Sequence, residues 1–162
     1  MFDKFGVMSS PEEINSLAEN LFNEGDAESL LAMAEENGID KEIAQAYMEG
    51  ELPELCDAQA AAAGKLAVEA KELKLKEIML DWLGYIEAQC LESEEFARAV
   101  RSKEKNLKGC IAALLKWSFA NQIPIDQEIV KAAGVSAGRV TMGIPGMGQA
   151  RKIIRDYYGG AA

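Results

Sequence analysis

Short segments that begin with a helix-capping residue and end at a glycine dominate the start of the chain, and they constrain the fold more than any other feature. Ser10, Pro11 and Glu13 place a side-chain acceptor at the N-cap, proline at the first helical position and glutamate at the third. Aspartates at 26 and 40 are placed to open two more helices. Glycine, which ends helices readily, follows each segment at Gly25, Gly38 and Gly50. The sequence therefore predicts three short helices in the first 50 residues.

The rest of the chain also carries helical periodicity. An alanine-rich stretch runs from residue 60 to 73, and apolar faces at helical spacing follow in residues 75–90 and 107–117. No alternating run of β-branched residues stands between hairpin turns. We therefore expect an all-α, multi-helix bundle. Its expected parts are a small acidic N-terminal three-helix unit, residues 1–52, and a larger helical domain, residues 53–162.

Charge is distributed unevenly along the chain. Residues 1–60 contain 15 acidic and 2 basic side chains, whereas residues 61–162 contain 12 acidic and 15 basic ones. The chain as a whole carries a formal net charge of −10. An asymmetry of this kind is typical of a surface that binds a charged partner.

The residues that are absent exclude most hydrolase templates. The chain contains no histidine, which excludes serine and cysteine triads, the H-E-x-x-H zinc site and the Glu-x-x-His di-iron site. Gly64 and Lys65 resemble the end of a phosphate-binding loop, but Gln59 stands where glycine is required and Leu66 where serine or threonine is required. We therefore expect no enzyme, no cofactor and no metal.

The cysteines and tryptophans are interpreted as core residues. Cys56, Cys90 and Cys110 form no C-x-x-C pair, and the last two lie on apolar stripes, so reduced and buried thiols are expected. Trp82 and Trp117 are expected to anchor the same core. No apolar run approaches the length of a membrane span, and the N-terminus lacks the pattern of a secretory signal. The expected location is the cytoplasm of a bacterial host cell.

The segment of residues 126–158 suggests a second kind of function. Residues 129–140 resemble a helix-turn-helix, in which Gly134 makes the turn, Ser136 caps the second helix and Val140 packs it back. Glycine at 138 disfavours that second helix. An ordinary two-helix corner therefore stays an open alternative.

A glycine-rich loop follows and resembles part of a helix-hairpin-helix. There Gly146 and Gly148 would let backbone amides at a helix N-terminus approach a phosphate. Ala150 lies two residues earlier than the packing alanine of that motif. The basic side chains that would add counter-charge are Arg139, Arg151, Lys152 and Arg155.

Short blocks in the central helices resemble a known family. They are Leu75-Lys76-Glu77-Ile78, Tyr85-Ile86, Gln89-Cys90, Glu94-Glu95-Phe96-Ala97 and Leu107-Lys108-Gly109-Cys110-Ile111. Together they resemble the PcfK-like proteins of conjugative elements and phages, a group that includes anti-CRISPR inhibitors of Cas9. The similarity covers roughly residues 75–130. It implies a protein of a phage or mobile genetic element, without catalytic residues, that acts on a CRISPR effector nuclease.

An acidic helical surface is compatible with that implication. Carboxylates can take the place of phosphates in the cationic channel of a Cas9-type effector. The candidate partner-binding residues lie near the ends of the second and third helices, where carboxylates are locally unfavourable: Glu35, Glu36, Glu49, Glu51, Glu54 and Asp57. Two alternatives stay open: a purely solubilising acidic face, and a small DNA-binding or accessory protein that uses residues 126–158. An exposed apolar edge on the alanine-rich helix would also allow a homodimer.

Overall fold

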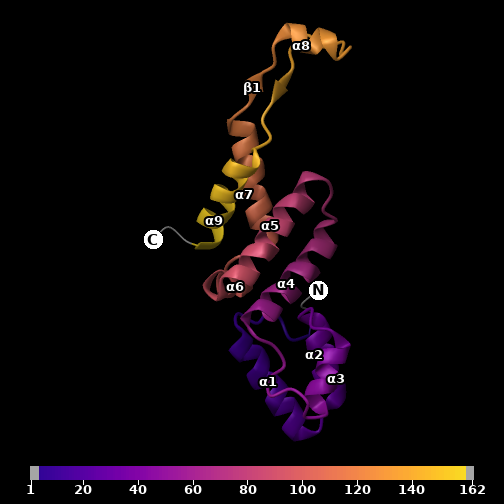
Figure 1. Ribbon diagram of the computed structural model, residues 1–162. Coiled ribbons are helices and arrows are strands. Elements are labelled where there is room, and N and C mark those ends of the chain that lie inside the picture. The colour runs from indigo at the N-terminus through magenta and orange to yellow at the C-terminus, as the bar shows by residue number, and fades with distance from the viewer. Residues whose placement is uncertain (1–3, 160–162) are drawn as a thin grey trace.

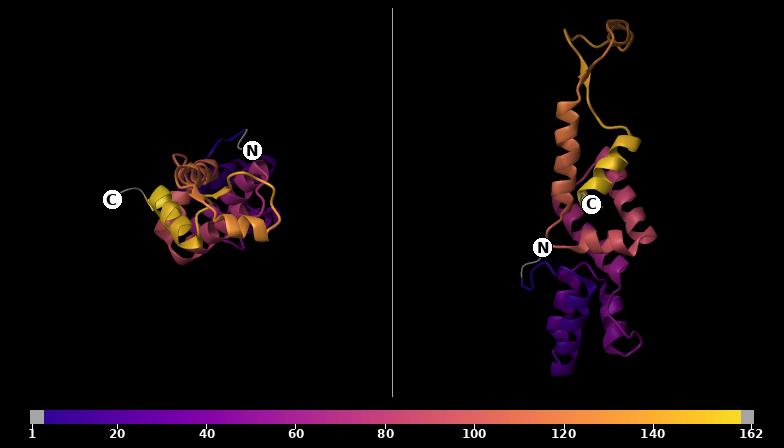
Figure 2. Two further views of the ribbon diagram at one scale, coloured as in Figure 1. Left: turned by 90° about the horizontal axis from the view of Figure 1, so that it is seen from above. Right: turned by 90° about the vertical axis from the view of Figure 1, so that its left-hand side faces the viewer.

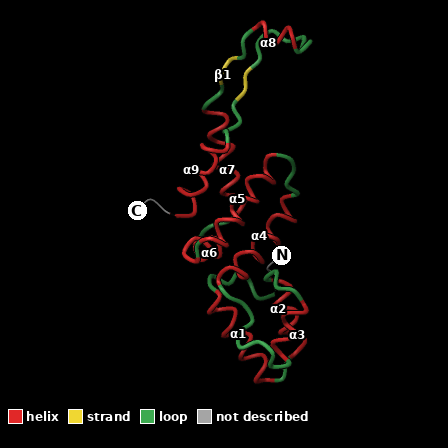
Figure 3. Tube along the Cα trace, viewed as in Figure 1, coloured by secondary structure: helices red, strands yellow, loops and turns green. Residues whose placement is uncertain are grey.

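The computed structural model describes residues 4–159 and is built from helices arranged along one long axis (Figure 1). Three short helices lie at one end, a group of longer helices forms the middle, and a thin arm projects from the other end (Figure 2). The only strands among the described residues are two short ones in that arm (Figure 3). The expected all-α class is confirmed, as is the small N-terminal three-helix unit.

The N-terminal unit consists of α1 (Pro11–Glu24), α2 (Ala27–Glu36) and α3 (Lys41–Met48). The hydroxyl of Ser10 accepts a hydrogen bond from the Glu13 backbone N–H at 3.2 Å, and Gly25 ends α1 in the left-handed region with φ 71°. Asp26 caps α2. Apolar faces of the three helices meet in a small core, which includes Ile14, Ala18, Leu30, Met33 and Ala44. Side-chain capping is therefore as predicted for α1 and α2, whereas Asp40 stands at the N-cap of α3 without a side-chain cap hydrogen bond.

The larger unit consists of α4 (Ala58–Leu73), α5 (Ile78–Glu92), α6 (Glu94–Arg101), α7 (Leu107–Ala120) and α9 (Met147–Gly159). Its core includes Leu66, Trp82, Ile86, Leu107, Leu114 and Ile154. Helix α4 contributes to both cores, because Ala61 packs with the N-terminal unit and Ala62 with the larger one. The expected division between residues 52 and 53 stays a prediction, since one helix is shared by the two cores.

Residues 121–146, which we call the arm, connect α7 to α9. They contain β1 (Ile123–Pro124), α8 (Gln127–Ala132) and β2 (Thr141–Met142). The strands are antiparallel, with Ile123 opposite Met142 and Pro124 opposite Thr141. In Figures 1 and 2 the arm extends beyond the end of α7, away from the N-terminal unit.

The helix-turn-helix prediction is wrong. Helix α8 ends at Ala132, and no helix follows before α9 begins. Gly134 makes the predicted turn with φ 67°, and the Val135 N–H closes it by donating to the Val130 carbonyl at 3.3 Å. The Val140 carbonyl then accepts from the Ile125 N–H at 2.9 Å. The segment expected to form a recognition helix therefore returns as an extended chain that pairs with the β1 side of the arm.

The helix-hairpin-helix prediction fails at its first helix. The element before the glycine-rich loop is the strand β2, so no helical hairpin surrounds that loop. The second half of the motif is present, because the Gly146 carbonyl accepts from the Ala150 N–H at 2.9 Å as α9 begins. Ala150 is fully buried in the larger core. The alanine therefore packs despite its early position, and this packing fixes the register of α9.

The cysteine predictions are confirmed for burial and for the free thiol state. Cys56, Cys90 and Cys110 are all buried and unpaired by disulfides. Burial raises the pKa of the Cys90 and Cys110 thiols to about 12 each, which keeps them protonated at neutral pH. Trp82 is buried as expected, whereas Trp117 is only half-buried.

Candidate functional site

A buried arginine links the two cores. Arg101, at the end of α6, donates from Nε to the Met8 carbonyl at 2.7 Å and from one terminal nitrogen to the Ala61 carbonyl at 3.1 Å. Its other terminal nitrogen donates to the Asn37 side-chain oxygen at the end of α2. Burial lowers the pKa of Arg101 to about 10. One guanidinium therefore holds the N-terminal segment, α2 and α4 against α6.

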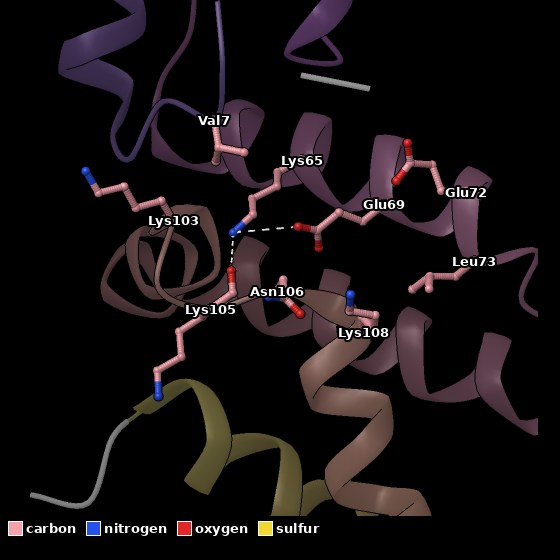
Figure 4. A pocket seen from close by; sticks show the side chains of 9 residues that line it. All are labelled: Val7, Lys65, Glu69, Glu72, Leu73, Lys103, Lys105, Asn106 and Lys108. Atoms are coloured by element: carbon pink, nitrogen blue, oxygen red, sulfur yellow. Dashed lines mark hydrogen bonds and ion pairs between the residues drawn. The ribbon is translucent and has the colours of Figure 1, made fainter. Parts of the chain in front are cut away.

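A buried lysine fixes the loop that follows α6. Lys65 of α4 is only 1% exposed, and its ammonium donates to the carbonyls of Val100 at 2.9 Å, Ser102 at 2.6 Å and Lys105. The Glu69 carboxylate lies 3.8 Å from the same nitrogen (Figure 4). Burial lowers the pKa of Lys65 to about 8.

The geometry of Lys65 gives it a structural role. A perturbed lysine beside a carboxylate is a candidate nucleophile or general base. Here, however, the three ammonium protons point to three backbone carbonyls, and a lysine has no further donor. These hydrogen bonds would have to break before the nitrogen could attack a substrate.

We refer to Arg101, Lys65 and the groups that they bind as the joint.

Two glycines complete the joint. Gly38 follows α2 with φ 74°, and Gly64 lies in α4 directly against it. A Cβ atom on Gly64 would overlap the Asn37 carbonyl, and one on Gly38 would overlap the Gly64 carbonyl. The backbone of the N-terminal unit therefore approaches α4 more closely than any other residue type allows.

A cavity of about 220 Å³ adjoins Lys65, and several of the charged side chains that line it, including Lys65, Glu69 and Lys105, already have contacts within the chain (Figure 4). The Glu69 carboxylate accepts from the Leu107 N–H at 2.7 Å, so it occupies the anion position at the start of α7. The Lys105 ammonium lies 5.1 Å from the centre of the Tyr157 ring. The cavity thus lies between the N-terminal segment, α4, the α6–α7 loop and the start of α7.

The six predicted partner-binding carboxylates fall into two groups. Glu36 accepts hydrogen bonds from the backbone N–H groups of Lys4, Phe5 and Gly6 at 3.1–3.2 Å. Asp57 caps α4 by accepting from the Ala60 N–H at 2.7 Å. These two therefore have structural roles inside the chain. The remaining four residues are exposed, and none of their carboxylates forms a hydrogen bond or ion pair within residues 4–159: Glu35, Glu49, Glu51 and Glu54.

Further carboxylates of the N-terminal unit share this state, and the sequence analysis did not single them out. Five more are exposed and lack a side-chain partner within residues 4–159. These five carboxylates are spread along α1, α2 and the start of α3 and form no motif, so only the acidic composition of this part of the sequence could have indicated them. We call the combined set the acidic surface: Glu19, Glu24, Glu28, Glu35, Asp40, Glu42, Glu49, Glu51 and Glu54.

A groove of about 670 Å³ runs between α2, the start of α3 and α4 beside this surface. Its walls include the apolar side chains of Leu31 and Val68, and Glu28, Glu35 and Asp40 of the acidic surface also line it. Lys41 and Lys71 line it as well, so the groove combines half-buried apolar contacts with charges of both signs, of which three are negative and two positive.

The basic residues predicted for nucleic acid are split between two elements. Arg139 lies in the arm, whereas Arg151, Lys152 and Arg155 lie exposed on α9. The Arg151 guanidinium lies 5.3 Å from the centre of the Tyr85 ring of α5. Exposed glycines at 146 and 148 flank the start of α9. Only the α9 residues and this loop are neighbours along the chain.

No metal or membrane site emerges from the described part of the chain. Residues 4–159 contain no group of three or more cysteine, aspartate or glutamate side chains placed to hold a metal ion. Within the same residues, no helix combines the length and apolar character needed to cross a bilayer.

Comparisons with protein families, with curated proteins and with solved structures find no match for this chain. The acidic surface and the α9 residues are therefore interpreted from their own geometry and charge.

Proposed function

We propose that this protein is a non-enzymatic, anti-CRISPR-type inhibitor from a phage or mobile genetic element, and that it binds a Cas9-like effector through the acidic surface. One observation carries the proposal: these carboxylates are exposed and form no hydrogen bond or ion pair within residues 4–159. Only two basic residues, Lys4 and Lys41, stand among the first 60 residues of the sequence. Uncompensated negative charge is attracted to a cationic channel, and its binding there releases bound counterions as the binding of nucleic acid does.

The resemblance to PcfK-like proteins supports the source and class of the protein rather than the binding surface. Its blocks contribute Cys90, Ala97, Leu107 and Cys110 to the larger core. They therefore concern the helical scaffold, whereas the acidic surface lies on a different unit. The residues of these blocks would accordingly maintain the fold, and the acidic surface would bind the partner.

Charge reversal with a matched control tests the proposal. One variant carries Glu35→Lys, Glu49→Lys and Glu51→Lys; the control carries Glu87→Lys, Glu95→Lys and Glu104→Lys, which change the net charge equally on exposed sites outside the N-terminal unit. Binding to a purified Cas9–guide complex and inhibition of its DNA cleavage are measured at several salt concentrations. The first variant should bind about tenfold or more weakly with a flatter salt dependence, and the control should stay within about threefold of wild type.

Two outcomes contradict the proposal. If neither variant differs from wild type, the acidic surface only confers solubility. If wild type forms no complex with any Cas9-type effector, the partner is of another kind.

A small DNA-binding or accessory protein is the second candidate, and the exposed Arg151, Lys152 and Arg155 on α9 favour it. The recognition helix that it would need for reading bases is missing, so any contact would involve the phosphate backbone. A gel shift of duplex DNA without effector, lost on alanine substitution of the three α9 residues, would support this function in place of inhibition.

A further inference from the structure

The arm exposes large apolar side chains on one side of its strand pair. Ile123 and Met142 are cross-strand neighbours and are 61% and 57% exposed. Ile144, two residues beyond Met142, is 61% exposed. Opposite residues on paired strands, and residues two apart on one extended strand, project from the same face. We call these three side chains the arm patch.

The arm is held in position at its base, but the patch itself is uncovered. The Gln122 side-chain nitrogen donates to the Ser118 carbonyl at 2.7 Å, and the Thr141 hydroxyl donates to the Gln122 side-chain oxygen at 2.9 Å. Pro145 is buried at the start of α9. An isolated strand pair is at best marginally stable in water, and grouped exposed apolar side chains mark interaction sites. An arm that is anchored yet apolar on its free side suits a partner contact.

The charge distribution of the chain is compatible with a second copy as the partner of the arm. The arm contains Asp126, Glu128, Lys131 and Arg139 and therefore carries no net charge. The strong negative charge of the chain lies in residues 1–60, at the opposite end of the elongated molecule (Figures 1 and 2). Two copies that meet arm to arm keep their acidic units apart by more than the screening length of about 8 Å at physiological salt. A pairing in which the two N-terminal units face each other would instead bring their like charges together.

We propose that the arm patch is a homodimer contact, in which Ile123, Met142 and Ile144 of one copy pack against the same residues of a second copy across a two-fold axis. Such an isologous contact needs one self-complementary patch and closes after two subunits. It leaves both acidic surfaces pointing outwards and accessible. The contact is independent of the proposed function, since it uses none of the acidic residues.

Sedimentation velocity of the full chain, from roughly 1 to 500 μM, tests the proposal because a modest apolar contact falls in this range of dissociation constants. The wild type should shift from the monomer mass towards twice that mass. A variant with Ile123→Thr, Met142→Thr and Ile144→Thr should stay monomeric, with self-association weakened by at least about tenfold. A control with Leu80→Gln and Leu91→Gln, which changes exposed leucines of α5, should dimerise as wild type does.

The outcomes separate this proposal from the proposed function. The arm variant should keep the circular dichroism spectrum and the effector binding of wild type, because its changed residues lie outside the cores and the acidic surface. A wild type that stays monomeric throughout the range overturns the homodimer, as does an arm variant that dimerises normally. If the arm variant loses effector binding instead, the patch contacts the effector and the proposal is wrong.

Discussion

The joint buries charged side chains, whereas the arm exposes apolar ones. At the joint, two cations lie inside the protein and their donors reach carbonyl or amide oxygens. In the arm, apolar side chains face solvent and the hydrogen bonds lie at the base. Buried charges are tolerated only when they are fully hydrogen-bonded, so the joint is sensitive to change. We therefore expect the joint to determine stability and the arm to determine association.

The largest effect is expected for Arg101→Met. This change leaves the Met8 carbonyl, the Ala61 carbonyl and the Asn37 side-chain oxygen without their buried donor. Each buried acceptor that loses its donor costs about 1–3 kcal/mol, so the three together should cost about 3 kcal/mol or more. Urea denaturation should report that decrease in the free energy of unfolding.

Arg98→Met is the matched control, because it removes the same group from the same helix. Arg98 is exposed and pairs with Glu12 at 2.8 Å and Glu94 at 2.9 Å. Water and salt screen such exposed ion pairs, so this substitution should leave the free energy of unfolding close to that of wild type. Equal destabilisation by the two substitutions would contradict the structural role assigned to Arg101.

The next largest effect concerns close packing at the joint. Gly64→Ala should lower the free energy of unfolding by about 2–3 kcal/mol, because its Cβ would overlap the Asn37 carbonyl and backbone must move. Gly84→Ala provides the comparison in α5, where a Cβ meets no atom within 4 Å. There alanine should stabilise the helix by about 0.5–1 kcal/mol. Thermal or urea unfolding of the two variants should give shifts of opposite sign.

Titration of Lys65 should give an effect of intermediate size. Its pKa is about 8 in the folded protein, below the ordinary 10.5, so between these values the unfolded chain binds more protons. Stability therefore rises with pH in that window, relative to a chain that lacks this group. The difference in unfolding free energy between wild type and Lys65→Met should change in favour of wild type by about 2 kcal/mol from pH 8 to pH 10.

The comparison of wild type with Lys65→Met also separates the pH dependence of stability due to Lys65 from that due to the cysteines. Burial raises the pKa of the Cys56 thiol to about 11 and those of Cys90 and Cys110 to about 12. Stability from these groups is lost as pH rises above the ordinary value of 9. Both proteins contain the three cysteines, so that loss cancels in the difference. A difference that stays constant with pH would contradict the lowered pKa of Lys65.

Local sequence signals predicted the helices but not the joint. The cap at Ser10 and the stop at Gly25 depend on neighbouring residues alone, so they could be identified without tertiary information. Lys65 and Arg101 are buried only because carbonyls from distant segments converge on them. A weak signal existed for Arg101, which shares a helical face with Ala97 and Val100, both buried. Long cations on such a face often extend to solvent instead, so the pattern alone does not predict burial.

The failed helix in the arm has a different cause. The turn at Gly134 is present as predicted, but the conformation of residues 135–142 depends on pairing with residues 123–125. A two-residue strand leaves no alternating pattern in the sequence, so the competing extended structure gave no signal. In the acidic surface, likewise, the sequence located exposed glutamates but gave no sign that Glu36 binds backbone amides far along the chain.

The smallest effect is expected for Ile123→Thr, and it sharpens the contrast between joint and arm. The side chain is exposed, and threonine keeps the β-branched shape that suits a strand, so at micromolar or lower concentration the unfolding free energy should change by no more than about 0.5 kcal/mol. Dimerisation stabilises the folded state by mass action, so the wild-type melting temperature should rise with protein concentration and that of the variant should rise less. Melting curves over a hundredfold range of concentration measure this difference. A variant that is destabilised equally at all concentrations would mean that Ile123 supports the fold of its own chain, and the arm would then resemble the joint.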